Sequence, residues 1–350
     1  MEREYYQAVI IGGGPAGLSA ALNLLSLGVK DILVVERFVF PRYKCCAGYI
    51  TAKTREEYKR LGLDIENCNY SLIKDFNICY KYKTKLNIKN KFLFTNRKID
   101  RVELDNALFE LAKSRGIEIA EGVKIAEHRP EENEFTLSDG ATVKYENAIF
   151  ADGTTGFGSR YQKTKKRNIA MQLTFSEERE EAIYIHFGKT KRGYSWVSSF
   201  GGTVNVGLTD VYNPKINYHD VFAEFLKELN IQADIGDLKA AFTPIGVNKS
   251  VLFNNVYFVG DAVGACDPLT LSGLRYALRS GEMCARAISG NRAKIYTSYI
   301  RKMKVKFFFM KVIMKVFYLK PVLSFGFNVF CRLFGRTVSG IFNNFFVNKK

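Results

Sequence analysis

A glycine-rich turn constrains the fold of this 350-residue chain more than any other feature. Gly12, Gly14 and Gly17 follow an apolar run at residues 7–11 and precede a helical pattern at 16–27. Such a turn between a strand and a helix is typical of the βαβ unit that binds a dinucleotide. The first glycine permits the tight turn, the second lets the backbone approach a pyrophosphate, and the third lets helix and strand pack closely.

A carboxylate at the expected distance completes this unit. A second apolar run at 29–36 ends in Glu36, nineteen residues after Gly17. A carboxylate there can accept hydrogen bonds from both hydroxyls of a ribose, while the N–H groups at the start of the helix hold the phosphates. The sequence therefore predicts a dinucleotide site, which could hold either NAD or FAD.

The remaining hydrophobic pattern predicts an α/β fold with a discontinuous nucleotide-binding domain. Buried, parallel-type strands and helices are indicated in residues 1–70, 101–160 and 246–295. Residues 71–100 and 161–245 alternate polar and apolar side chains, which favours an inserted antiparallel, β-rich substrate domain. We expect the third part, residues 296–350, to be a basic, aromatic, helical tail.

Charge and cysteine content exclude several classes of protein. The net charge is +17, but residues 283–350 hold fourteen Lys and Arg and no acid, so the preceding 282 residues are nearly neutral. This distribution favours an anionic surface met by the tail over a nucleic-acid partner. The seven cysteines are irregularly spaced and the three histidines are scattered, which argues against a disulfide framework and a metal site. Acidic residues near Met1 argue against a signal peptide, so we expect a cytoplasmic protein.

Two later segments favour FAD over NAD. Asp152 and Gly153 end one buried run, and Gly260 and Asp261 end another. An acid at a strand end beside glycine can reach a ribityl hydroxyl, although Asp-Gly is also a common turn. With the glycine turn, these segments resemble FAD-dependent oxidoreductases of the para-hydroxybenzoate hydroxylase-like class over about residues 5–290. The resemblance implies that Asp261 binds the ribityl chain, that Glu36 binds the adenosine ribose and that Arg101 lies near the cofactor. The alternative for Arg101 is a surface charge at a helix start.

Four local segments resemble one branch of this class, the geranylgeranyl reductase family. The segment 40–48 resembles its Pro-x-x-Lys-x-Cys-Gly-Gly loop, with Ala47 in place of a glycine, and Tyr194 and Trp196 resemble its Tyr-x-Trp-x-Phe-Pro cavity motif. Residues 205–208 resemble its next strand, and 260–277 resemble its Gly-Asp segment, with Leu271 and Ser272 in place of glycine and glutamate. The turn from Pro268 to Gly273 would then place backbone N–H groups beside the flavin pyrimidine edge. The resemblance and the motifs imply a cofactor site of Gly12, Gly14, Pro15, Ala16, Gly17, Glu36, Arg37, Lys44, Cys46, Ala47, Gly48, Arg101, Asp152, Gly153, Gly260, Asp261, Pro268, Gly273 and Leu274.

Three side chains carry expectations about catalysis and the substrate. Cys46 could supply a proton beside the flavin, helped by Lys44, or could simply pack the loop. Trp196, the only tryptophan in the chain, could form a cavity wall or a core plug, and Tyr194 could contact substrate or pack on a neighbouring strand. We expect Cys46 to be catalytic and Tyr194 and Trp196 to bind the substrate.

The tail has the composition of a membrane-interface segment. On a helix, Lys304, Lys311 and Lys315 share one face, and its longest uncharged run, 337–348, is too short to span a bilayer. The tail could instead be a helical cap packed on the substrate domain, with its lysines in solvent. We expect peripheral binding to an anionic membrane on the inner face of the cell membrane.

These observations predict an FAD oxidoreductase that reduces C=C bonds of a prenyl or related lipid. The alternatives are a flavin monooxygenase that hydroxylates an apolar or aromatic substrate and a non-enzymatic flavin-bearing membrane sensor. A halogenase is disfavoured because its Trp-x-Trp-x-Ile-Pro signature is missing. The electron donor, NAD(P)H or a ferredoxin, and the oligomeric state are left open.

Overall fold

A parallel sheet forms the half of the molecule that contains the glycine turn. The computed structural model describes residues 4–73, 75–81, 83–88, 97–162, 166–248 and 251–319. The strand order of this sheet is β17-β18-β11-β1-β2-β8, and the hairpin β9–β10 attaches to β11. The strands are β1 (Tyr5–Ile11), β2 (Ile32–Glu36), β8 (Glu118–Glu121), β9 (Ile125–Arg129), β10 (Glu134–Leu137), β11 (Thr142–Phe150), β17 (Leu252–Phe253) and β18 (Val256–Phe258).

Parallel pairing of β1 with β2 and with β11 brings distant segments to one edge of this sheet. The turn after β1, the end of β2 and the end of β18 therefore meet at the carboxyl ends of the strands. The helices of this half are α1 (Pro15–Ser26), α2 (Ala52–Leu61), α3 (Arg101–Ser114) and α5 (Leu274–Ser289). Helices α1 and α5 pack closely because Gly281 lies against the α1 backbone, and the Ser19 hydroxyl donates to the Leu278 carbonyl at 2.7 Å.

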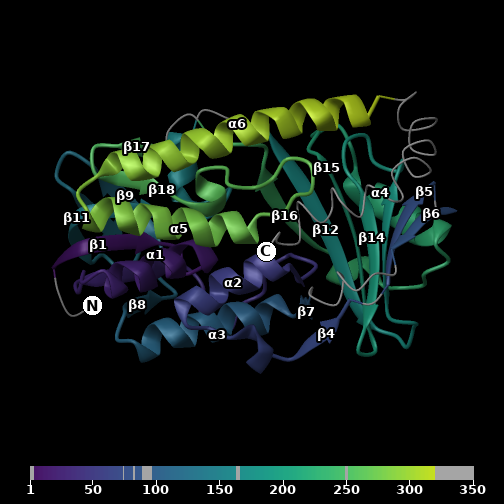
Figure 1. Cartoon of the computed structure of the whole chain (residues 1–350), viewed down its shortest axis with the longest axis horizontal. Coiled ribbons are helices and arrows are strands. Elements are labelled where there is room, and N and C mark those ends of the chain that lie inside the picture. The colour runs from purple at the N-terminus through teal and green to yellow at the C-terminus, as the bar shows by residue number, and fades with distance from the viewer. Residues whose placement is uncertain are drawn as a thin grey trace.

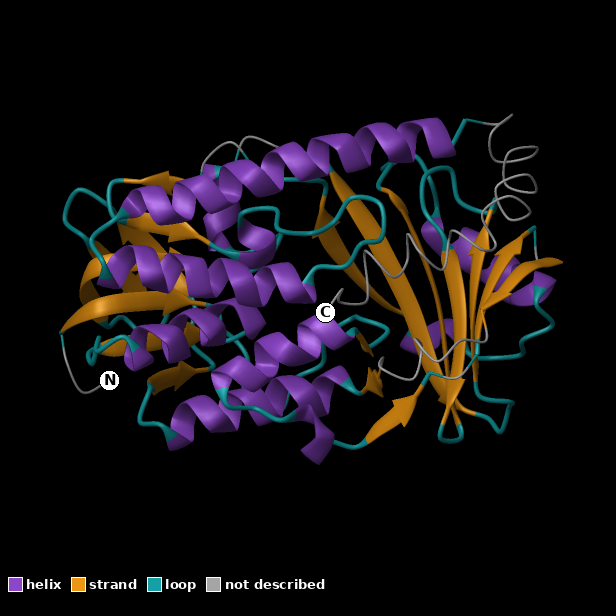
Figure 2. Cartoon of the chain, viewed as in Figure 1, coloured by secondary structure: helices purple, strands orange, loops and turns teal. Residues whose placement is uncertain are grey.

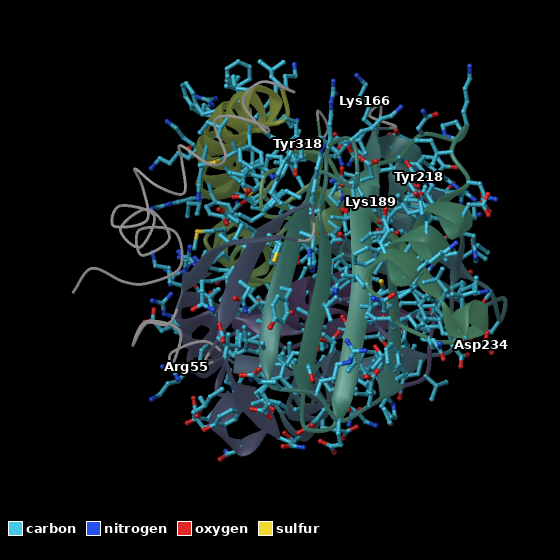
Figure 3. All side chains as sticks on the ribbon, turned by 90° about the vertical axis from the view of Figure 1, so that its right-hand side faces the viewer. Arg55, Lys166, Lys189, Tyr218, Asp234 and Tyr318 are labelled. Carbon is cyan, nitrogen blue, oxygen red and sulfur yellow. The ribbon has the colours of Figure 1, made fainter. Side chains whose placement is uncertain are left out.

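A seven-stranded sheet forms the other half (Figure 2). Its order is β16-β12-β15-β14-β13-β5-β6, and every pair is antiparallel except β13–β5. One face packs against helix α4 (Tyr218–Glu228) through Phe222 and Phe225, and Figure 3 shows Tyr218 and Asp234 on this covered side. The strands are β5 (Phe76–Tyr80), β6 (Lys83–Ile88), β12 (Arg167–Ser176), β13 (Ala182–Phe187), β14 (Ser195–Phe200), β15 (Thr203–Val211) and β16 (Lys239–Pro244).

The segment 71–100, expected to join the substrate domain, is divided between two sheets. Strands β5 and β6 join the seven-stranded sheet, whereas β7 (Arg97–Ile99) pairs with both β3 (Tyr49–Ile50) and β4 (Tyr70–Leu72). The period-2 pattern identifies strands but does not say which sheet they join. Residues 74, 82 and 89–96 of this segment lie outside the described residues, and the predicted domain boundaries stay a prediction.

Helix α6 (Ala293–Phe317) runs along both halves (Figure 1). Its buried face, including Tyr296, Ile300, Met303 and Phe307, belongs to the core of the parallel-sheet half. Its end reaches the seven-stranded sheet, where the Tyr318 hydroxyl donates to the Gly193 carbonyl at 2.8 Å. In the part of the tail that is described, up to residue 319, the helix packs on the body and spans both halves. The uncharged run at 337–348 lies outside the described residues. Within the described ranges, no helix is both long and apolar enough to cross a bilayer.

Candidate flavin site and substrate chamber

One continuous cavity of about 1300 Å³ connects the glycine turn with the seven-stranded sheet. Its lining extends from Gly12 and Glu36, through the 42–51 loop, to Trp196 on β14 and Phe317 on α6. Every predicted site residue lines this cavity except Gly17, Gly260 and Pro268. Ligand pockets commonly enclose about 300–1,000 Å³, so this space is large enough for a cofactor and a substrate side by side.

The glycine turn has the backbone geometry of a phosphate cradle. Gly12 has φ +111°, and a Cβ on it would lie 2.6 Å from the Ala151 carbonyl oxygen. Gly17 packs against the turn itself, since its Cβ would lie 2.0 Å from the Gly12 oxygen. Helix α1 starts at Pro15 without a side-chain cap from the described residues. Its first N–H groups are therefore available to an anion.

Glu36 already holds the turn but keeps capacity for a ligand. Its Oε2 accepts from the Gly13 N–H at 2.7 Å, and its Oε1 accepts from the Phe38 N–H at 3.0 Å. Each carboxylate oxygen has a second lone pair, so Glu36 can still accept from ribose hydroxyls. The side chain thus fixes the turn as well as facing the cavity, which the sequence did not indicate.

Arg42 lies over the glycine turn and was missed by the sequence analysis. Its Nε is 3.9 Å from Glu36 Oε2, and its Nη1 is 3.9 Å from Asp105 Oδ2. A Cβ on Gly14 would lie 3.3 Å from its Nη2. The Nε is buried and has no hydrogen-bond partner among the described residues. A guanidinium at this place whose buried Nε lacks a hydrogen-bond partner among the described residues fits a pyrophosphate. The only available sequence signal was its position inside the 40–48 loop.

Arg101 is buried at the start of α3, so the alternative of a surface charge is wrong. Only 6% of it is exposed, and it donates to both Asp105 carboxylate oxygens at 2.8–2.9 Å. Burial alone would lower the pKa of this guanidinium, but Asp105 outweighs burial and raises it. The pair therefore presents a permanently charged group to the cavity.

The two predicted strand-end aspartates have different surroundings. Asp152 Oδ2 accepts from the Gly158 N–H at 2.7 Å and shapes the following turn, whereas its Oδ1 is buried without a partner among the described residues. Burial raises the pKa of Asp261, and the charges of Lys44 and Arg101 oppose that increase. Lys44, expected beside Cys46, thus also lies close to the Asp261 carboxylate.

Asp152 and His128 give folding opposite dependences on pH. Burial raises the pKa of Asp152 from 3.8 to about 6, so between these values the folded chain keeps a proton that the unfolded chain loses. Stability therefore falls as pH rises, by at most about 3 kcal/mol. Burial lowers the pKa of His128 from 6.5 to about 4, so stability falls as pH decreases through that range, by a similar amount. Burial also lowers the pKa of His186 to about 4 and raises that of Asp261, so two histidines and two aspartates act in opposite directions.

The segment after β18 turns against α1 and then leads into α5. Gly260 has φ +60°, and its Cβ would lie 2.7 Å from the Ala16 Cβ, so its role is close packing. Leu271 has φ +56°, the left-handed conformation that suits the glycine of the resembled motif. Leu269 and Thr270 donate their N–H groups to Asp267 Oδ1. The cavity-lining N–H groups best placed for a ligand are therefore those at the α5 start, Gly273 and Leu274.

The chamber beside the seven-stranded sheet has aromatic walls fixed by hydrogen bonds. Trp196 donates from Nε1 to Asn205 Oδ1 at 2.7 Å, and its indole fills the space above Gly207. Tyr194 donates its hydroxyl to the Thr270 carbonyl at 2.9 Å. Both line the cavity, so Trp196 forms a cavity wall and not a core plug.

Cys46 is exposed and lies where the two parts of the cavity meet. The Cys46 side chain lies within electrostatic range of the buried hydroxyls of Tyr49 and Tyr194 and of the Arg101 guanidinium. Burial raises the pKa of both tyrosines, so both stay protonated at neutral pH. Burial also raises the pKa of Cys45 to about 11, which fits an inert packing role. Tyr49, like Arg42, is a cavity residue that the sequence analysis missed.

These residues fit FAD. An uncapped helix N-terminus, a glycine cradle that admits no Cβ, a carboxylate beside the turn and a guanidinium with a buried Nε match the anionic and hydroxyl groups of a dinucleotide. Residues 5–170 match the family model of the FAD binding domain. The match supports the predicted FAD cofactor and the predicted FAD-dependent oxidoreductase.

The chain is similar to members of the geranylgeranyl reductase family, as its four local segments predicted. It is 29% identical over 317 residues to the digeranylgeranylglycerophospholipid reductase of Methanococcus vannielii, covering 82% of this chain and 78% of that protein. It is 26% identical over 325 residues to the menaquinone reductase of Mycolicibacterium smegmatis, covering 83% and 78%. Among solved structures, a geranylgeranyl bacteriochlorophyll reductase-like protein of Thermoplasma acidophilum superimposes with a TM-score of 0.77 at 19% identity, covering 90% and 88%.

Proposed function

We propose that this oxidoreductase reduces an isolated C=C bond in the chain of a prenyl lipid. The observation that carries the proposal is the single cavity that joins the dinucleotide cradle to an apolar, aromatic-walled chamber. The chamber suits a hydrocarbon chain, and two relatives similar in sequence are named menaquinone reductase and digeranylgeranylglycerophospholipid reductase. Bound FAD, once reduced by NAD(P)H or a ferredoxin, supplies a hydride to one carbon of the double bond, and the second carbon takes a proton.

The chain's own residues would bind the cofactor, orient the lipid chain and supply the proton. Glu36, Arg42 and the α1 N-terminus would hold the dinucleotide, and Asp261 its ribityl hydroxyls. Trp196 and Tyr194 would position the lipid chain by packing on it. Cys46, at the junction of the two parts of the cavity, is the proposed proton donor.

Mass spectrometry of lipids incubated with the reduced protein tests this proposal. A gain of two hydrogens without oxygen is the expected result. A gain of one oxygen atom, only in air, would instead place the protein among the monooxygenases, and no change with any lipid, donor or acceptor would favour a flavin-bearing sensor. Cys46→Ala should keep FAD and lose most turnover, whereas Cys45→Ala, the matched neighbour, should keep both.

We also propose that the protein binds the anionic inner face of the cell membrane through α6. The solvent side of this helix carries apolar residues at the spacing of one helical face, opposite its buried face. We call this set the apolar stripe: Val305, Phe308, Phe309, Val312, Ile313 and Val316. Apolar side chains flanked by lysines are the pattern of an interfacial helix.

Lysines lie along both edges of the stripe. One edge is formed by Lys304, Lys311 and Lys315. Burial lowers the pKa of Lys311, and the charges of Lys315, Lys304 and Lys166 on the body lower it further. Figure 3 places Lys166 on the upper edge of the molecule, along which α6 also runs. The second edge includes Lys306, which is exposed.

Vesicle sedimentation with a paired substitution tests membrane binding. Phe308→Ser with Phe309→Ser removes two side chains that are each about 60% exposed and leaves the buried face of α6 intact. We expect at least a tenfold weaker association with phosphatidylglycerol vesicles, since each buried phenylalanine is worth about 1.5–3 kcal/mol. The control pair Leu27→Ser and Val39→Ser, also exposed but away from α6, should bind like the wild type. Equal binding of both pairs would contradict the proposal.

A further inference from the structure

Ile313 belongs to two surfaces at once. It is 49% exposed on the apolar stripe, and it also lines the cavity. Met310 and Phe317, on the neighbouring turns of α6, line the same cavity from the covered side of the helix. Helix α6 is therefore the wall between the chamber and the solvent-facing stripe, and Ile313 lies at the rim where the two meet.

Helix α6 is fixed to the body at its C-terminal end, and the loop 269–272 lines the same cavity. The Phe317 ring packs against Phe187 with ring centroids 5.3 Å apart, and Tyr318 is bonded to Gly193, so this end is tied to the seven-stranded sheet. The loop 269–272 also lines the cavity and is partly exposed throughout. The rim residue Ile313 and this loop thus border the same cavity.

Positive charge is concentrated beside this rim. Lys306 lies seven residues before Ile313, which places both on the same edge of the helix. Its Nζ donates to the Tyr276 hydroxyl at 2.6 Å. Burial and the nearby Arg275 guanidinium lower the pKa of Lys306, and burial, Arg275 and Lys306 lower that of Lys53. Arg275 already pairs with Glu57 at 3.4 Å, and the charges of Asp267 and Glu56 partly offset those of Lys306 and Lys53. An anionic headgroup at this place would add to that compensation.

We infer that the lipid chain enters the chamber laterally from the bilayer, between α6 and the loop 269–272, past Ile313. The occupant of the rim is the hydrocarbon chain of a membrane lipid, and the anionic lipid surface lies against Lys53, Arg275 and Lys306. This inference rests on the proposed function, because it takes the membrane as the source of the substrate. It explains why the stripe and the chamber share a residue.

A photoreactive lipid tests this route. Phosphatidylglycerol vesicles carry a prenyl lipid with a diazirine at the end of its chain, and labelled peptides of the holoprotein are mapped by mass spectrometry. Ile313→Trp fills the rim, whereas Val312→Trp adds the same ring to a stripe residue that does not line the cavity. We expect the wild type and Val312→Trp to be labelled in the peptide containing Tyr194 and Trp196, and Ile313→Trp to be labelled at least tenfold less at equal vesicle binding.

The outcomes separate this route from the proposed chemistry. Three outcomes would overturn lateral entry even if turnover is normal. They are equal labelling of Ile313→Trp and the wild type, labelling confined to the cavity-lining Arg37 and Phe38 on the dinucleotide side, and no labelling of the chamber. Chamber labelling that depends on residue 313 without any reduction of the lipid would support the route and contradict the reductase proposal. Ile313→Ala, which widens the rim and keeps the fold, should label at least as fast as the wild type; slower labelling would also overturn the inference.

Discussion

Substitution of Gly207 by alanine would test whether the indole of Trp196 is held as a chamber wall. The two residues lie opposite one another on β15 and β14. A Cβ on Gly207 would lie 2.1 Å from Cζ2 and 2.4 Å from Cε2 of Trp196. Carbon atoms in contact lie about 3.5–4.0 Å apart, so the indole must move by about 1.5 Å.

The displacement has a cost that follows from the contacts of the indole. The bond from Trp196 Nε1 to Asn205 Oδ1 at 2.7 Å is broken or stretched, which costs about 1 kcal/mol. Overpacking at a filled position costs about 1–3 kcal/mol. We expect Gly207→Ala to lower the free energy of unfolding by about 2–4 kcal/mol and to raise KM for the lipid. FAD should be retained, because Gly207 does not line the cavity.

A double-mutant cycle, measured by urea unfolding followed by circular dichroism, isolates this contact. In a Trp196→Ala background the new methyl group meets no indole, so Gly207→Ala should cost less than about 1 kcal/mol and the coupling should exceed about 1 kcal/mol. Gly236→Ala is the matched control, since the atom nearest to a Cβ there is Asp234 Oδ1 at 3.3 Å. A Gly207→Ala protein as stable as the wild type, with unchanged KM, would refute the reasoning.

Three other substitutions address the flavin half. Asp105→Asn leaves the Arg101 guanidinium buried and only partly paired, and should destabilise the protein by about 3–5 kcal/mol in thermal unfolding. Glu110→Gln, on the exposed side of α3, is the control and should have little effect. Equal effects of the two substitutions would contradict the role of the Arg101–Asp105 pair. Asp261→Ala should lose the bound flavin, measured by its visible absorbance, and a stoichiometrically loaded variant would show that this carboxylate does not hold it. Asp152→Asn removes a titration that makes stability fall as pH rises, so from pH 4 to 6 the stability of the cofactor-free variant relative to the wild type should rise by up to about 3 kcal/mol. Urea unfolding at several pH values checks this, and a variant profile parallel to that of the wild type would be the contrary result.

The dinucleotide half was largely predictable because its signals are local. The glycine turn, the helix after it and the acid after the second strand are fixed by backbone conformation within some thirty residues. The burial of Arg101 was not predictable in this way. It depends on Asp105 one helical turn later and on the 42–51 loop folding over both, and a helix-start arginine alone looks the same whether exposed or buried. Arg42 was missed for the same reason, since only the folded loop places it over Gly14.

The tail shows where a sequence pattern reaches its limit. Helix α6 is apolar on two opposite faces, one through Met303 and Phe307 and the other through Val305 and Phe309. A hydrophobic period of 3.6 is present on both, so the pattern indicates a helix but not which face the body covers. The sequence analysis therefore set membrane contact and packing on the body against each other as alternatives. For the described part of the tail the structure removes that opposition, because packing covers one face of α6 and leaves the other exposed among the described residues. Substitutions of the six stripe side chains can therefore test membrane contact through α6 without disturbing the core beneath.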